Sequence, residues 1–174
     1  MSEILFLAHR IPFPPDRGDK IRSHHVLKRL AELAPVHVAT LAEDNFDRAE
    51  ESALAAVAAS YHLAQRSKPL PLAGLEALAS GKPVSVTAFH SRALEGYIAM
   101  VLATRPIGAI CVFSGQMGHY VPASFKGRVV MDFVDVDSAK FEAYGKAKSG
   151  PRGWIDAREG RELCLLYTSD AADE

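Results

Sequence analysis

Short apolar runs alternate along the chain with longer stretches whose apolar residues recur every three to four positions. Runs rich in β-branched and aromatic residues indicate buried strands, and the periodic stretches indicate amphipathic helices. The predicted strands are 4–8, 36–41, 61–64, 107–113 and 128–134; the predicted helices are 21–33, 46–60, 70–79 and 91–104; and 84–86 is either a strand or an extended loop. Strands this apolar, separated by helices, favour an α/β fold with a parallel sheet flanked by helices.

The loop between the first predicted strand and the first predicted helix carries the strongest functional signal. Three prolines within 12–15 stiffen it, and Gly18 lets the backbone approach a ligand closely where the helix begins. Asp19 can cap this helix, but Lys20 and Arg22 lie in its first turn, where the helix dipole disfavours cations. Cations in this position make sense if an anion docks there. An ordinary turn glycine with solvated basic side chains explains the same residues equally well.

Candidate ligand-binding side chains also follow two other predicted strands. In a parallel α/β sheet, ligands bind beyond the carboxyl ends of the strands. Ser114 and Gln116 come directly after 107–113 and can present donors to a hydroxylated or phosphorylated ligand. A helix start capped by Ser114 is an equally good interpretation. At the end of the last predicted strand, we interpret Asp132 and Asp135 as candidates for binding sugar hydroxyls or stabilising positive charge.

Short motifs narrow the chemistry only slightly. Asp135-Val136-Asp137 resembles the D-x-D metal clamp of glycosyltransferases with a single nucleotide-binding domain, and also the D-x-D nucleophile motif of haloacid-dehalogenase-like phosphatases. Both patterns are short, and we assign no metal ligand. No P-loop pattern occurs, and the chain lacks the G-x-G-x-x-G of a standard dinucleotide-binding domain and the G-x-S-x-G of a hydrolase elbow.

The C-terminal stretch 164–174 resembles a translation of the transposase end and adapter used in sequencing-library preparation. We expect it to be a read-through artefact, so that the natural protein continues past Leu163. Without the three acidic residues of this stretch, 20 basic residues face 18 acidic ones, a net charge near +2.

Neither that charge nor the −1 of the whole chain suggests a nucleic-acid-binding protein, and no dense Lys/Arg stripe is present.

Cys111 is the one cysteine outside 164–174, which excludes an internal disulfide within 1–163 and fits a reducing compartment. No signal peptide pattern and no apolar run of about 20 residues occurs. We therefore expect a cytoplasmic protein.

The stretch 4–22 resembles the start of retaining, family-4-type glycosyltransferases, which have two Rossmann-like domains (the GT-B fold). More narrowly, it is similar to the sugar transferases associated with PEP-CTERM/exosortase exopolysaccharide systems. The stretches 132–141 and 158–161 also look like parts of that subgroup, and the resemblance covers 4–163.

The resemblance implies an N-terminal, acceptor-side Rossmann-like domain at 1–145, followed at 146–163 by a linker and the start of an interdomain helix. The C-terminal donor-binding domain would lie beyond this chain. The first glycine loop of the family lies against the donor diphosphate, so that role carries over to Gly18, with Arg17, Lys20 and Arg22 beside it. Asp135 takes the place where many relatives have a catalytic His-Asp pair, but Val134 precedes it, so the histidine is missing.

The sequence therefore predicts part of a glycosyltransferase that uses a nucleotide sugar and needs no cofactor. Its acceptor would be a glycan or a lipid-linked glycan in exopolysaccharide biosynthesis. A metal-dependent D-x-D transferase, a phosphatase-like enzyme and a non-catalytic anion-binding α/β module remain as alternatives. Peripheral contact with the inner face of the cytoplasmic membrane is also open, because Trp154 with Arg152 and Arg158 fits either a membrane patch or a domain-closing helix.

Overall fold

The computed structural model describes residues 2–66, 70–81 and 83–133, together with Trp154, Arg158 and Gly160. The chain divides into two compact units, the first made of Met1–Ser67 and Phe89–Val134 and the second of Lys68–Ala88 and Asp135–Glu174. The elements are β1 (Glu3–Ala8), α1 (Gly18–Leu33), β2 (Val36–Ala42), α2 (Asn45–Ala49), α3 (Glu51–Ala55), β3 (Ser60–Gln65), α4 (Leu70–Ser80), α5 (Val84–Phe89), α6 (Arg92–Thr104), β4 (Ile107–Phe113), the 3-10 helix η1 (Gly115–Tyr120) and β5 (Arg128–Asp132).

The first unit contains a five-stranded, wholly parallel sheet in the order β3-β2-β1-β4-β5. In its centre, Ile4 of β1 pairs with Val36 of β2 on one side and with Ala109 of β4 on the other. The chain builds the sheet outward from β1 in one direction and then in the other, so the strand order reverses between β1 and β4. The predicted α/β architecture is confirmed, and it is Rossmann-like.

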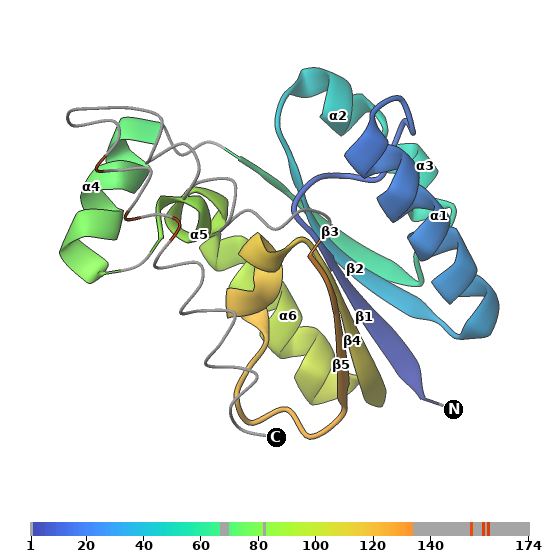
Figure 1. Ribbon diagram of the computed structural model, residues 1–174. Coiled ribbons are helices and arrows are strands. Elements are labelled where there is room, and N and C mark those ends of the chain that lie inside the picture. The colour runs from blue at the N-terminus through green and yellow to red at the C-terminus, as the bar shows by residue number, and fades with distance from the viewer. Residues whose placement is uncertain are drawn as a thin grey trace. The chain divides into compact units, whose positions relative to one another are not determined.

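Helices cover both faces of this sheet, with α1, α2 and α3 on one face and α6 on the other (Figure 1). Successive residues of β1 point to opposite faces, so Leu5 packs in the cluster that contains Ile98 of α6. Phe6 packs with Leu27 of α1 and Leu54 of α3. Burial on both faces explains why the central strands are continuously apolar rather than alternating.

The first helix begins earlier than its apolar pattern predicts, at Gly18 rather than at residue 21. Its N-cap is Arg17, in an extended conformation and with no side-chain cap hydrogen bond, so the prediction that Asp19 caps the helix is wrong. The carboxylate of Asp19 is bound instead by Arg10, whose guanidinium lies 2.7 Å away. Because α1 already begins at Gly18, Asp19 lies within the first turn and not at the N-cap position before it. By contrast, Ser91 accepts a hydrogen bond from Leu94 and caps α6.

Two other predicted elements differ from the structure. The helix predicted at 46–60 is two short helices, because the backbone turns at Glu50 (φ −85°, ψ 4°). The segment 84–86, predicted as a strand or extended loop, is the start of the helix α5. Its β-branched residues favour a strand, but Thr87 donates its backbone N–H to Pro83 and its hydroxyl to the carbonyl of Val84 at 2.9 Å. These hydrogen bonds close a helical turn.

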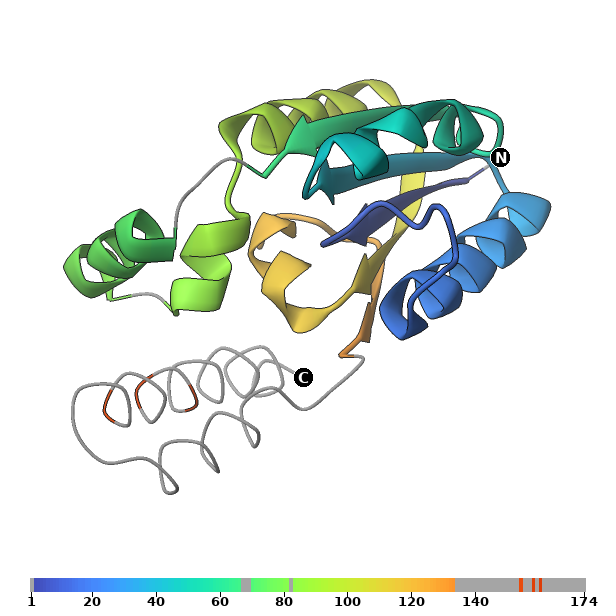
Figure 2. The same ribbon diagram turned by 90° about the horizontal axis from the view of Figure 1, so that it is seen from above.

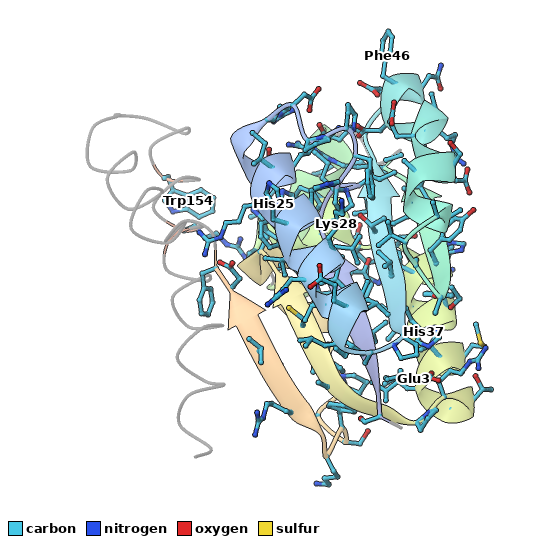
Figure 3. The ribbon with its side chains drawn as sticks, turned by 90° about the vertical axis from the view of Figure 1, so that its right-hand side faces the viewer. Glu3, His25, Lys28, His37, Phe46 and Trp154 are labelled. Atoms are coloured by element: carbon cyan, nitrogen blue, oxygen red, sulfur yellow. The ribbon has the colours of Figure 1, made fainter. Side chains whose placement is uncertain are left out.

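A network of hydrogen-bonded polar side chains links α6 to the amino ends of three strands. The imidazole of His37 contacts Glu3 and Ser60, each at 2.7 Å, and the hydroxyl of Ser60 contacts that of Tyr97 at 2.7 Å. Figure 3 shows Glu3 and His37 together at the lower end of the sheet, opposite Phe46. These contacts tie β1, β2, β3 and α6 together at the edge where the strands begin.

Candidate functional site

Polar side chains follow four of the five strands directly, at the carboxyl edge of the sheet. His9 and Arg10 follow β1, Glu43 follows β2, Arg66 follows β3 and Ser114 follows β4. Figure 2 is seen from above, so that this edge faces the reader. Because parallel strands end at the same edge, residues far apart in the sequence meet there. This is the edge at which α/β sheets bind ligands, above all where the strand order reverses.

An arginine cluster occupies this edge: Arg10, Arg17 and Arg66 with the carboxylates of Asp19 and Glu43. Arg10 reaches Asp19 at 2.7 Å and Glu43 at 2.5 Å, and Arg66 reaches Glu43 at 2.5 Å. Arg17 lies farther from the same two carboxylates, at 3.6 and 3.9 Å, and its side chain is 55% exposed. Three guanidinium groups thus face two carboxylates, which leaves one net positive charge in the cluster.

Opposite charges in the cluster stabilise the ionised forms of Asp19 and Arg10. Partial burial alone would raise the pKa of Asp19, but the charge of Arg10 and other neighbouring donors outweigh it, and the pKa of Asp19 is lowered. Burial works against the charge of Arg10 as well, but its hydrogen bond and charge contact with Glu43 outweigh this and raise its pKa. Both shifts favour the ionised forms of Asp19 and Arg10. Arg17 is the cation with the loosest contacts.

His9 lies beside the arginine cluster and carries no charge at neutral pH. Its ring stacks on that of Phe113 (centroids 6.2 Å apart) and meets the ring of Phe89 edge-on at 5.8 Å. Burial, followed by the charge of Arg10, lowers the pKa of His9, although Asp19 lies 3.6 Å from its Nε2 atom. Phe89 also packs beneath the guanidinium of Arg66, 4.7 Å from the ring centroid. The aromatic rings therefore hold both polar groups in place.

Lys20 and Gly18, which the sequence predicts as phosphate contacts, lie outside the arginine cluster. Lys20 is only 5% exposed, and its ammonium donates to Asp47 at 2.6 Å and to the carbonyl of Phe13 at 3.1 Å. Gly18 is exposed at the first position of α1, and nothing lies within 4 Å of the place that a Cβ atom would take. Phosphate contact by either residue stays a prediction. The ammonium of Lys20 already has a buried carboxylate partner.

The structure brings four other predicted site residues together around the ends of β4 and β5. Arg22 of α1 reaches the carboxylate of Asp132 at 2.8 Å, and the backbone N–H of Ser114 donates to the carbonyl of Asp132 at 2.8 Å. The hydroxyl of Ser114 donates to the side-chain oxygen of Gln116 at 2.5 Å. We call these four residues the switch-point group, because they lie beside the place where the strand order reverses.

Asp135, the predicted catalytic residue, lies outside the described residues, as do Asp137 and most of the predicted linker and interdomain helix. Among the residues that the structure does describe, no group of three or more His, Cys, Asp or Glu side chains is placed to hold a metal ion. Over the same residues, no helix has the length and apolar character needed to cross a membrane.

The sequence alone indicates no role for Arg10, Glu43 or Arg66. A usable signal was present, since each of them stands within two positions of the end of a predicted strand. What the sequence could not show is that the three side chains converge. That convergence depends on the order of the strands in the sheet.

Comparison of the chain with protein-family models, with curated proteins and with solved structures gives no significant match.

Proposed function

We propose that the α/β unit is the acceptor-side domain of a retaining glycosyltransferase of the family-4, GT-B type. The protein would transfer a sugar from a nucleotide-sugar donor to a glycan or lipid-linked acceptor in exopolysaccharide biosynthesis, at the inner face of the cytoplasmic membrane. One observation carries the proposal: the stretch 4–22 that resembles these enzymes forms β1, the following loop and the first turn of α1, and this segment supplies two arginines of the cluster.

The chemistry of the proposed reaction requires a positive field at this edge of the sheet. A glycosyltransferase stabilises a departing nucleoside diphosphate, and fixed cations achieve this without a metal ion. The arginine cluster has one positive charge more than its carboxylates balance. Arg17 is exposed and its contacts are long, so it can turn toward a diphosphate while Arg10 and Arg66 stay paired with Glu43.

The switch-point group would face the uncharged part of the ligand. Carboxamides and hydroxyls both donate and accept hydrogen bonds, and carboxylates accept them strongly. All three groups are therefore suited to binding sugar hydroxyls. Asp132 provides the carboxylate and Gln116 the carboxamide, which the hydroxyl of Ser114 contacts. In the enzymes that the chain resembles, the nucleotide-sugar pocket belongs mainly to a second domain, so we expect this chain alone to bind the diphosphate weakly and to transfer no sugar.

Calorimetric titration with UDP and GDP, and with uridine and guanosine as uncharged controls, tests the proposal. The nucleoside diphosphates should bind and the nucleosides should not, and binding should weaken as salt is added. Replacing Arg17 with Gln should weaken binding about fivefold, which corresponds to about 1 kcal/mol for one exposed charge-assisted contact. Arg29, which is 77% exposed and pairs with Glu32 on α1, provides the control, and Arg29→Gln should change nothing.

Failure of both diphosphates to bind, or equal binding of diphosphates and nucleosides, would contradict the proposal. Diphosphate binding that disappears with EDTA and returns with Mn²⁺ would favour the metal-dependent D-x-D alternative. Binding without any transfer, even by a longer form of the protein that includes a second domain, would favour the non-catalytic anion-binding module.

A further inference from the structure

Ser114 has a backbone conformation that costs free energy. Its φ is +80° and its ψ is 130°, and it is the one non-glycine residue with positive φ among the residues that the structure describes. A Cβ atom makes this region unfavourable, and glycine is the residue that normally adopts it. Such conformations persist only when their surroundings hold them, and they concentrate at sites of function.

Three hydrogen bonds hold Ser114 in this conformation. Its N–H donates to the carbonyl of Asp132 at 2.8 Å, its carbonyl accepts from the N–H of Met117 at 3.0 Å, and its hydroxyl donates to Gln116 at 2.5 Å. The residue is only 4% exposed, so its own side chain is not placed to be the main ligand contact. What it determines is the direction of its neighbours: the carboxamide of Gln116 and the end of β5 at Asp132.

The position of Ser114 links the two parts of the site. It directly follows Phe113, on whose ring the imidazole of His9 stacks beside the arginine cluster. Asp132, which accepts its N–H, is paired with Arg22, one helical turn beyond Gly18 on α1. A ligand whose diphosphate lay at Arg17 and whose uncharged part extended along this edge, past β1 and β4, would meet Gln116 and Asp132.

We propose that Ser114 is a positioning residue of this site. Its backbone and hydroxyl hold Gln116 and Asp132 in the arrangement that binds the hydroxyl groups of a sugar attached to the diphosphate. The inference rests on the proposed function and adds to it that sugar recognition at this edge depends on a strained serine. A glycine here would relieve the strain and loosen the arrangement, so folding stability and sugar affinity should change in opposite directions.

The test uses the full chain with Ser114→Gly, Ser114→Ala and the control Ser124→Gly, an exposed serine without positive φ. Thermal unfolding is measured for each variant, and affinity is measured for UDP, UDP-glucose, GDP and GDP-mannose. We expect the wild type to bind at least one nucleotide sugar more tightly than its parent diphosphate. Ser114→Gly should raise Tm, weaken binding of that sugar at least threefold and leave the parent diphosphate within twofold. Ser114→Ala should weaken binding of the nucleotide sugar by a similar factor without raising Tm. Ser124→Gly should change neither the affinity nor Tm.

The outcomes separate the two claims. If Ser114→Gly binds the nucleotide sugar as tightly as the wild type does, or loses affinity for the parent diphosphate equally, Ser114 has only a structural role. If the wild type binds diphosphates with no preference for an attached sugar, the inference fails while the proposed anion site stands. If the wild type binds none of the four probes, both claims fail.

Discussion

The buried pair of Lys20 and Asp47 distinguishes a structural lysine from a phosphate-binding one. The ammonium and the carboxylate lie 2.6 Å apart, and the two side chains are 6% and 7% exposed. Replacing Lys20 with Met keeps most of the side-chain volume but leaves the carboxylate of Asp47 buried without its cation. Removing one partner of a buried ion pair costs about 3–5 kcal/mol. Asp47 keeps a hydrogen bond from the backbone N–H of Glu43 at 2.8 Å, so we take the lower value, about 3 kcal/mol.

For a chain of this size, about 3 kcal/mol corresponds to a decrease in Tm of about 6–12 °C. The measurement is thermal unfolding at neutral pH, followed by circular dichroism. Arg29→Met is the matched control, because Arg29 is 77% exposed and its pair with Glu32 should contribute less than about 1 kcal/mol. The double variant Lys20→Met/Asp47→Leu should recover part of the loss, since it removes the unpaired charge.

The reasoning is refuted if Lys20→Met unfolds within about 2 °C of the wild type, which is less than 1 kcal/mol. If that variant were as stable as the wild type and also lost affinity for inorganic pyrophosphate, Lys20 would be a ligand-binding residue, as the sequence motif predicts. If it were destabilised as calculated, the lysine in the first turn of α1 would belong to the core.

Three further predictions follow from the surroundings of single groups. Because burial, followed by the charge of Arg10, lowers the pKa of His9 below its usual 6.5, the unfolded chain takes up a proton more readily than the folded one. Stability should therefore fall as the pH drops below about 6.5, and Tm of His9→Gln should vary less with pH than that of the wild type; equal pH dependence would contradict this. Burial raises the pKa of the Cys111 thiol from 9.0 to about 11, so in a Cys164→Ser chain it should alkylate at pH 8 about a hundredfold more slowly than an ordinary thiol; alkylation at the ordinary rate would show that Cys111 is not protected. In the proposed function arginines supply the positive charge, so binding of UDP should be the same with EDTA and with Mn²⁺; a metal requirement would refute this.

The sequence was sufficient to predict the architecture, because both faces of the sheet are covered and the strands are therefore continuously apolar. The runs at 36–41 and 107–113 match β2 and β4 within a residue. The predicted helix at 70–79 also matches α4 within a residue, and Gly81, just past its end, has φ +71°. The failures are short elements. At α5, hydrogen bonds to Pro83 and Val84 outweigh the strand preference of β-branched residues.

The candidate site was only partly predictable, because its residues are joined by tertiary contacts. The sequence places Arg17 and Lys20 side by side in one motif, whereas the structure exposes the first and buries the second against Asp47. Nothing in the local pattern separates the two, since the partner of Lys20 lies 27 positions away. The strained backbone of Ser114 is equally invisible in the sequence, because glycine is the residue that a positive φ normally indicates.

The central claim is that the carboxyl edge of this sheet binds a diphosphate through exposed cations. The most direct test is to titrate the ¹⁵N-labelled chain with inorganic pyrophosphate and follow the backbone amide and arginine side-chain resonances. We predict saturable shifts that centre on Arg17, Gly18 and Asp19 and extend to Arg22. Unchanged spectra, or shifts that centre on Glu3 and His37 at the opposite edge, would contradict the claim.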